Sequence, residues 1–371
     1  MDDRDFMSVA LCHARLGAGR VNPNPMVGAV IVRDGEIIAT GHHDHFGGWH
    51  AERAALEAAK RAGVDVRGAT IYVTLEPCCH TGKQPPCSKA LIDAGLARVV
   101  IGSPDPNPLV SGNGVNQLRD AGIEVVEGVL RDECDRLNEI FLYAITTRTP
   151  FVMLKYAMTL DGRIATSTGL SRWITGEDAR RRVHEDRGRF ASIMVGVSTV
   201  LADDPQLTCR IDGGHDPVRV VCDTHLRTPI DAAIVATARE TPTIIATAVD
   251  DERRTLPYRE AGCEILRVDA DDDGHVSVAG IVRALGERGL DSVMIEGGGT
   301  LAWSALRDHV VSKVSAYVAP KLFGGRNAPG PVSGEGVAAP DDAFRIIDRT
   351  VATVGSDIVI EGGVEYVHGN R

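Results

Sequence analysis

Apolar and polar residues alternate along the first part of the chain with the periods of helices and strands. Apolar positions at helical spacing predict a helix over 4–17, and Asp34-Gly35 predicts a tight hairpin between strands at 27–32 and 36–40. The elements that follow alternate between helix and strand, at 50–61, 70–75, 87–94, 97–101, 114–121 and 124–127. This alternation predicts an α/β fold in which helices cover a mostly parallel sheet.

A polar segment ending in a proline, 146–150, interrupts this pattern, and a second series begins at Phe151. We expect strands at 151–156, 191–196, 218–222, 243–247, 263–268, 291–295, 314–318 and 351–360, with helices at 176–187 and 277–288. A chain of 371 residues has room for two domains. We therefore expect two α/β domains, 1–146 and 147–371.

Composition and charge narrow the class of protein. Forty Lys and Arg residues against 51 Asp and Glu give a net charge of −11, and aromatic residues make up only 4% of the chain. An acidic, aromatic-poor chain argues against nucleic-acid binding, which depends on cations and on base stacking. The N-terminus has no basic-then-apolar leader pattern, and the most apolar stretch, 192–202, is shorter than the roughly 20 residues of a membrane-spanning helix. We expect a cytoplasmic protein with no membrane partner.

The cysteines are too few for a disulfide framework, but three of the eight lie close together, at Cys78, Cys79 and Cys87. A catalytic zinc needs about three nitrogen or sulfur ligands and an open position for water. His50 and Cys87 each begin a predicted helix, where the helix dipole favours a thiolate. We therefore expect His50, Cys78 and Cys87 to bind Zn²⁺.

Glu52 is a candidate proton carrier beside this cluster. It lies two residues after His50, so it can reach a water beside the metal without displacing a ligand, and it can carry a proton to a leaving amine. His-x-Glu followed by Pro-Cys is the known pattern of zinc deaminases. A structural zinc completed by Cys79 or His80 is the alternative, and it leaves Glu52 unexplained.

The spacing of the cysteines points to one family. Eight residues separate Cys78 from Cys87, where nucleoside and nucleic-acid deaminases have two. With this insertion, and with Asn22-Pro23-Asn24-Pro25-Met26-Val27-Gly28 upstream, the first domain resembles the deaminase half of the bifunctional riboflavin-biosynthesis deaminase–reductases. The resemblance implies a cytidine-deaminase-like three-layer fold, the zinc ligands named above and Glu52 as the proton shuttle. It also implies substrate contacts from Asn24, His43, His80 and Lys83, for which ordinary loop structure is the alternative.

The second domain lacks the G-x-G-x-x-G pattern of dinucleotide-binding folds. Instead, an apolar strand at 293–296 runs into three glycines and a predicted helix, an arrangement that can hold a phosphate or simply make a tight connection. Together with the segments 155–163, 171–175 and 196–208, it resembles the reductase half of the same family. That half has a dihydrofolate-reductase-like fold and uses NADPH.

The resemblance assigns contacts in this second domain. The expected cofactor contacts are Ala157, Trp173, Thr175, Thr199, Asp203, Thr224, Gly298, Gly299, Thr300, Leu301, Ala302, Trp303 and Ser304. The expected substrate contacts are Lys155, Ser171, Arg187, Leu207, Arg210 and Glu296. The two arginines suit a sugar phosphate because a guanidinium binds such oxygens in pairs, although most arginines are simply solvated. For Trp173, the residue type without the resemblance favours packing in a core.

The resemblance implies two successive reactions on a pyrimidine ribose phosphate. The first is hydrolysis of an exocyclic ring amine with release of ammonia, and the second is hydride transfer to C1′ of the opened ribose. Lys155 and Asp203 are alternative candidates for the accompanying proton transfer, and the sequence does not choose between them. The resemblance also implies a dimer or a higher homo-oligomer. The competing hypotheses are a nucleic-acid or nucleoside deaminase with an appended reductase-like domain, a non-enzymatic zinc protein, and a chain with only one active domain.

Overall fold

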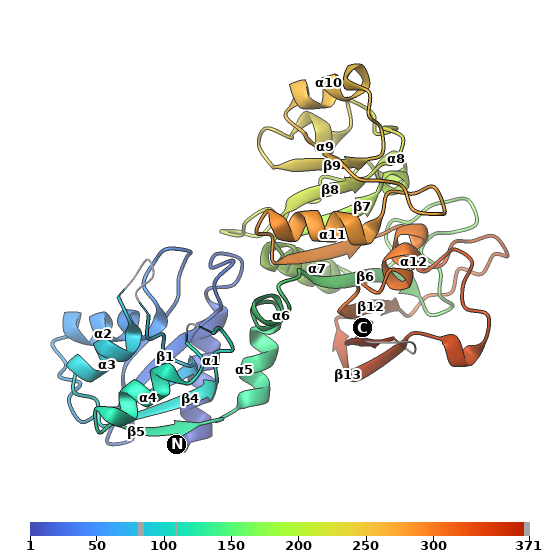
Figure 1. Ribbon diagram of the computed structural model, residues 1–371. Helices are drawn as coiled ribbons and strands as arrows, with labels where there is room; N and C mark the ends of the chain where they lie inside the picture. The colour runs from blue at the N-terminus through green and yellow to red at the C-terminus, as the bar shows by residue number, and fades with distance from the viewer. Residues whose placement is uncertain (81–84, 109, 367–371) are drawn as a thin grey trace. The chain divides into compact units, whose positions relative to one another are not determined.

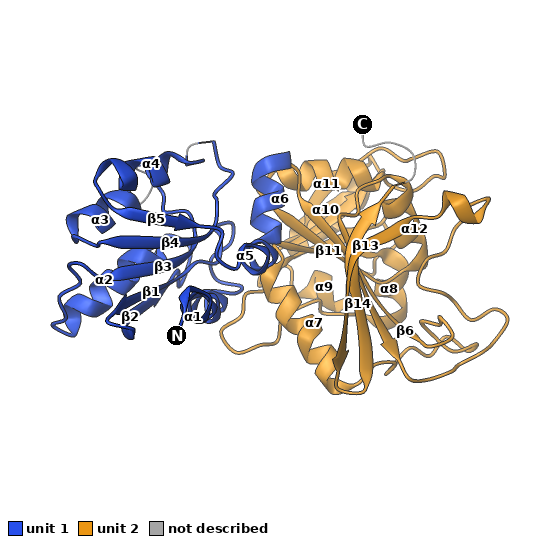
Figure 2. Ribbon diagram, turned by 90° about the horizontal axis from the view of Figure 1, so that it is seen from below, with its two compact units in different colours: residues 1–148 blue, residues 149–371 orange. Residues whose placement is uncertain are grey.

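The computed structural model describes residues 1–80, 85–108 and 110–366, and the chain divides into two compact units, 1–148 and 149–371 (Figure 2). The first unit extends slightly beyond the predicted limit of 146, because a helix continues through the polar segment and ends at Arg148 in a left-handed conformation. No helix among the described residues is long and apolar enough to cross a membrane.

The first unit, blue to green in Figure 1, contains a five-stranded sheet, and its order β2-β1-β3-β4-β5 can be followed in Figure 2. Its strands are β1 (Gly28–Arg33), β2 (Glu36–His42), β3 (Thr70–Leu75), β4 (Arg98–Ser103) and β5 (Glu124–Glu127). The hairpin at Asp34-Gly35 is confirmed, and it makes β1 antiparallel to β2. Because β1 is also antiparallel to β3, only the β3–β4 and β4–β5 pairings are parallel, so the sheet is less parallel than we expected.

Helices cover both faces of this sheet. They are α1 (Asp3–Arg15), α2 (Ala51–Arg61), α3 (Cys87–Asp93), α4 (Asn113–Asp120), α5 (Arg131–Leu137) and α6 (Glu139–Thr147). Helices α2, α3 and α4 share one apolar core with the sheet, and α1 and α5 share the core of the other face. The unit therefore has the three layers that the family resemblance implied. Helices α5 and α6 were not predicted.

Small residues set the position of α2, which begins next to the predicted metal site. Ala51, Ala55 and Ala59 form its buried stripe. A Cβ atom at Gly41 in β2 would lie only 2.3 Å from the backbone nitrogen of Ala55, so glycine is needed where the helix crosses the strand. This close approach fixes the N-terminal end of α2 against the sheet.

The second unit is built on a nine-stranded sheet with the order β10-β9-β8-β7-β11-β6-β12-β14-β13. Its strands are β6 (Phe151–Thr159), β7 (Ser192–Gly196), β8 (Val218–Cys222), β9 (Thr243–Thr247), β10 (Glu264–Arg267), β11 (Ser292–Glu296), β12 (Lys313–Ala319), β13 (Arg345–Val354) and β14 (Asp357–Glu365). The pairings from β10 to β12 are parallel. The prediction of one strand at 351–360 is wrong, because a turn at Gly355 divides this stretch between the antiparallel strands β13 and β14.

The helices of the second unit pack on both faces of this sheet. They are α7 (Glu177–Arg189), α8 (Val197–Asp203), α9 (Ala233–Ala236), α10 (Glu252–Ala261), α11 (Val278–Glu287) and α12 (Gly299–Arg307), with a 3₁₀ turn, η1 (Pro340–Asp342). Helices α11 and α12 contribute to the main apolar core, whereas α7 packs against Tyr317 and Val359. Helices α8, α9 and α10 were not predicted as separate elements.

Candidate active sites in the two units

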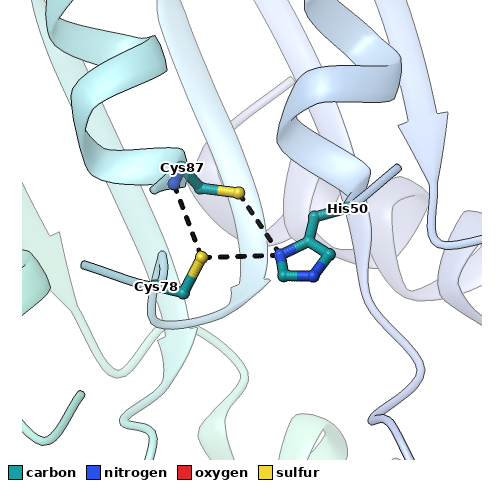
Figure 3. A group of neighbouring side chains, drawn as sticks. All are labelled: His50, Cys78 and Cys87. Carbon is teal, nitrogen blue, oxygen red and sulfur yellow. Dashed lines mark hydrogen bonds between the residues drawn. The ribbon is translucent and has the colours of Figure 1, made fainter. Parts of the chain in front are cut away.

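Three potential metal ligands converge in the first unit. His50 is the N-cap of α2, Cys87 is the first residue of α3, and Cys78 lies in the loop after β3 (Figure 3). The Nδ1 atom of His50 lies 3.5 Å from the Cys78 sulfur and 3.4 Å from the Cys87 sulfur, and all three ligand atoms lie within 4.8 Å of one another. One nitrogen and two sulfurs at this spacing fit a zinc ion with an open fourth position.

The surroundings of Cys78 favour its thiolate. The Cys87 side chain and the His50 ring, as hydrogen-bond partners, hold the pKa of Cys78 well below its ordinary value despite burial. The backbone N–H of Cys87, at the start of α3, also donates to the Cys78 sulfur at 3.4 Å. A thiolate is the form of cysteine that binds a metal.

Glu52 occupies the first turn of α2 and is almost completely buried, at 3% exposure. Burial and the nearby Cys78 raise its pKa from an ordinary 4.5 to about 7. A carboxyl group that titrates near neutral pH can both accept and return a proton, as a deaminase requires.

Three of the predicted substrate contacts of this unit, Asn24, His43 and His80, line one cavity with Glu52. The cavity has a volume of about 280 Å³, and its lining includes Asn24, His43, His50, Glu52, Cys78 and His80. His43 Nδ1 donates to the Trp49 carbonyl at 2.9 Å, so its Nε2 accepts from the Asn24 side chain at 3.1 Å. The Nδ1 atom of His80 is buried and has no hydrogen-bond partner among the described residues. Lys83 lies outside the described residues.

The same cavity contains acidic residues that our sequence reasoning missed, Glu76 and Asp105. The Glu76 carboxylate accepts four backbone N–H bonds, which come from Asp105 at 3.4 Å, Gly112 at 3.1 Å, Gly114 at 3.1 Å and Val115 at 3.3 Å. It therefore holds a loop whose Asp105 and Asn107 also line the cavity. Its place directly before Pro77-Cys78 was the only local signal for Glu76.

In the second unit, three predicted substrate contacts form a buried ion-pair cluster. The Glu296 carboxylate accepts two hydrogen bonds from Arg187, at 2.8 and 2.9 Å, and lies 4.0 Å from Lys155 Nζ. Lys155 and Glu296 are register partners in the adjacent parallel strands β6 and β11. Burial alone would raise the pKa of Glu296, but the two cations lower it to about 2. Burial lowers the pKa of Lys155, even though Glu296 opposes the shift.

Other predicted substrate contacts lie beside this cluster. Arg187 also donates to the Thr208 carbonyl at 3.1 Å, which joins the cluster to the segment that carries Leu207 and Arg210. The Ser171 hydroxyl donates to Asp203 at 3.2 Å, so a predicted substrate contact meets a predicted cofactor contact.

The glycine turn after β11 has the open backbone that a phosphate requires. Gly297 and Gly298 have positive φ angles of 77° and 85°. A Cβ atom on either would lie within 3.6 Å of the Thr199 side chain, a predicted cofactor contact at the start of α8. Helix α12 begins at Gly299 and directs its N-terminal end to the same place. This cradle fits a nucleotide phosphate.

The remaining predicted cofactor contacts differ in their surroundings. Trp173 is 62% exposed, with the Arg180 guanidinium 4.6 Å from its ring centroid, so it does not pack in a core. The Thr224 hydroxyl accepts from the Val276 N–H at 3.0 Å, and Trp303 packs against Phe344, so both have structural partners. Thr175, Leu301, Ala302 and Ser304 are buried. Ala157 pairs with Tyr317 across β6 and β12.

Comparisons with known proteins support the division of the chain into a deaminase-like unit and a reductase-like unit. The family model described as the RibD C-terminal domain matches residues 150–360, and the model described as the cytidine and deoxycytidylate deaminase zinc-binding region matches residues 1–103. A riboflavin biosynthesis protein RibD from Actinobacillus pleuropneumoniae is 50% identical, over 97% of this chain and 95% of that protein. The RibD of Escherichia coli strain K12 is 38% identical, over 97% and 99%.

Solved structures of related proteins agree with these sequence matches. The structure of a diaminohydroxyphosphoribosylaminopyrimidine deaminase/5-amino-6-(5-phosphoribosylamino)uracil reductase from Thermotoga maritima is 41% identical and covers 98% of this chain and 99% of its own, with a TM-score of 0.83. A RibD structure from Acinetobacter baumannii is 34% identical, with the same coverage and TM-score. The two-part α/β fold implied by the sequence is thereby confirmed.

Proposed function

Because the chain belongs to the RibD family of riboflavin biosynthesis proteins, we propose that it is a zinc-dependent deaminase and an NADPH-dependent reductase that act in succession. The substrate of the first unit is 2,5-diamino-6-(5-phosphoribosylamino)pyrimidin-4(3H)-one. The second unit reduces the ribosyl group of 5-amino-6-(5-phosphoribosylamino)uracil to ribityl. The observation that carries this proposal is the convergence of His50, Cys78 and Cys87 beside the buried Glu52 in one cavity.

In the first unit, His50, Cys78 and Cys87 would hold Zn²⁺, which would supply Lewis-acid activation of water. The Glu52 carboxylate accepts the proton of that water and returns it to the departing amine, which leaves as ammonia. Asn24 and His43 orient the pyrimidine, since their hydrogen bond fixes both side chains on the cavity wall. The unpartnered His80 Nδ1 is available to the ribose phosphate, with Lys83 beside it in the sequence.

In the second unit, NADPH bound at the glycine turn supplies the hydride. Glu296 stays ionised and orients Lys155 and Arg187, which would otherwise repel each other. We assign proton delivery to Lys155 Nζ, because this group is buried and its pKa is lowered, whereas Asp203 accepts a hydrogen bond from Ser171. Arg187 and Arg210 are the cations for the sugar phosphate.

We also propose a cytoplasmic location and a dimer or higher homo-oligomer, with no nucleic-acid partner. None of the eight cysteines, all of which lie among the described residues, forms a disulfide, and this suits a reducing compartment. Light scattering after size-exclusion chromatography tests the oligomeric state, and cell fractionation tests the location.

A coupled assay tests the two activities together. With the diaminopyrimidine ribose phosphate, we expect ammonia release followed by loss of NADPH absorbance. After removal of zinc with a chelator, both signals should disappear, and addition of the deaminated uracil compound should restore NADPH oxidation alone. Persistent ammonia release from the zinc-free chain would contradict the metal assignment, and turnover of single-stranded RNA in place of the nucleotide would favour a nucleic-acid deaminase.

A further inference from the structure

Arg219 in β8 is a charged residue, completely buried at 0% exposure, that the proposed reaction does not use. Its guanidinium donates to neutral oxygens of Gln206 (O, 3.3 Å), Thr237 (Oγ1, 2.8 Å), Thr241 (O, 2.7 Å) and Thr243 (Oγ1, 3.0 Å). Burial of a cation is costly unless its hydrogen bonds are fully satisfied. A guanidinium buried among neutral acceptors therefore calls for a specific role.

The Gln206 carbonyl belongs to a segment with an unusual backbone. Asp204, Leu207 and Arg210 have φ angles of 41°, 57° and 57°. This left-handed region is unfavourable for residues other than glycine, most of all for bulky ones such as leucine, and it persists only where the surrounding structure imposes it. The segment 204–210 therefore needs fixed anchors on its backbone.

Hydrogen bonds with three different residues hold the backbone of this segment. Arg219 donates to the carbonyl of Gln206, Arg187 donates to the carbonyl of Thr208 at 3.1 Å, and the Cys209 N–H donates to Asp216 at 2.8 Å. The second Asp216 oxygen accepts from the Thr241 hydroxyl at 3.3 Å, and the carbonyl of that threonine accepts from Arg219. The anchors thus belong to one connected network.

Gln206 links this network to the site. Its backbone carbonyl accepts from Arg219, and its side-chain oxygen accepts from the Arg210 guanidinium at 3.0 Å. A displacement of the Gln206 backbone would therefore move the cation that we assign to the sugar phosphate.

We propose that Arg219 is a positioning residue of the reductase, which holds Leu207 and Arg210 in their substrate-binding arrangement through the backbone of Gln206. This inference rests on the proposed function, in which Leu207 and Arg210 contact the substrate. It assigns to Arg219 an effect on substrate affinity rather than on the hydride step or on cofactor binding.

The test compares Arg219→Met and Arg219→Lys in the full zinc-loaded chain. For Arg219→Met we expect the KM for the deaminated uracil substrate to rise about ten-fold, with the KM for NADPH changed less than about two-fold. Arg219→Lys should give a smaller increase, because an ammonium keeps the charge but lacks the planar fork of a guanidinium. Ammonia release by the first unit is the internal control and should not change.

Leu285→Ala is the matched control, because Leu285 is completely buried in α11 and lies in the main apolar core. It should lower the thermal midpoint of unfolding without changing either KM. An unchanged substrate KM in folded Arg219→Met would overturn the proposal. An equal rise of the substrate KM in Leu285→Ala would overturn it as well, since Arg219 would then contribute only to stability.

If Arg219→Met does not fold, amide hydrogen exchange in Arg219→Lys tests whether Arg219 anchors the segment 204–210. Peptides covering 206–211 should exchange faster than in the unchanged chain, and unchanged exchange would contradict the anchoring role. Arg210→Ala separates this proposal from the proposed function. If it leaves the substrate KM unaltered, the substrate assignment of Arg210 is wrong, whereas hydrogen exchange still measures whether Arg219 anchors the segment.

Discussion

Glu52 in the first unit and Glu296 in the second are both buried carboxylates in candidate active sites, yet their ionisation is opposite. Burial, together with Cys78, raises the pKa of Glu52 to about 7. Glu296 is just as enclosed, but Arg187 and Lys155 lower its pKa to about 2. Burial alone does not decide what a carboxylate does. Two ion-pair partners keep Glu296 a fixed anion, whereas burial beside the Cys78 sulfur leaves Glu52 able to exchange protons at neutral pH.

The two sites also differ in how far apart their residues lie in the sequence. In the first, the three converging metal ligands and Glu52 lie within a short stretch, 50–87, in which two helix starts and one loop carry the ligands. In the second, Arg187 and Glu296 are 109 residues apart in sequence. A site built from neighbouring side chains leaves a motif in the sequence, and a site built from distant ion pairs does not.

The strongest test of this comparison is Glu52→Gln. We expect ammonia release to fall about 10³-fold, because the amide cannot accept and return the proton. The content of zinc, measured by atomic absorption, should be unchanged, since Glu52 is not among the converging ligands. NADPH oxidation with the deaminated substrate is the control. Loss of zinc would show instead that Glu52 supports the metal site.

Glu296→Gln should have the next largest effect. It leaves Lys155 and Arg187 buried without their anion, and breaking a buried pair of this kind costs about 3–5 kcal/mol of stability. We expect NADPH oxidation to fall about 10²-fold, because the two cations would separate. Asp271→Asn is the control, since Asp271 pairs with Arg307 at 2.7 Å, outside the Lys155–Glu296–Arg187 cluster. An equal loss of reductase activity in that variant would contradict a specific role for Glu296.

The ion pairs of Glu296 with Arg187 and Lys155 predict that the stability of the second unit depends on pH. The pKa of Glu296 is about 2 in the folded chain, below its ordinary 4.5, so its ionised form stabilises the folded state. That stabilisation is complete above about pH 4.5 and is lost as the pH falls towards 2. Hydrogen exchange of peptides from β6 and β11 should show the difference between the unchanged chain and Glu296→Gln shrinking across this range. A constant difference would argue against the ion pair.

Glu76→Gln should have an intermediate effect confined to the first unit. The amide offers one acceptor oxygen to the four backbone N–H groups that now bind the carboxylate, so the loop with Asp105 and Asn107 should loosen. We expect the KM for the diaminopyrimidine substrate to rise about ten-fold at unchanged zinc content. If zinc is lost as well, Glu76 acts through the neighbouring Cys78 rather than through the loop.

Cys79→Ser should have the smallest effect. The Cys79 sulfur lies 4.0 Å from the Val110 carbonyl and is absent from the group of converging ligands in the described part of the chain. We expect ammonia release to change less than about two-fold. A loss of zinc would identify Cys79 as a fourth ligand and would favour a structural metal.

The sequence predicted elements best where periodicity and turn residues agreed. Asp34-Gly35 marked the β1–β2 hairpin, and the alanine-rich run marked α2. The stretch 351–360 was misread as one strand, because its apolar residues continue across the turn at Gly355. The polar segment near 148 hid the end of α6, since polar residues fit an exposed helix as well as a linker.

For the sites, the sequence by itself determined which residues we expect to bind zinc, to carry the proton and to form the glycine turn, because these predictions depend on residue type and local spacing. Only the tertiary structure decided that Glu76 fastens a loop, that Glu296 lies between two cations and that Arg219 is buried against Gln206. The physical reason is that the energy of a charge depends on the groups around it, and in a folded chain most of those groups come from distant positions.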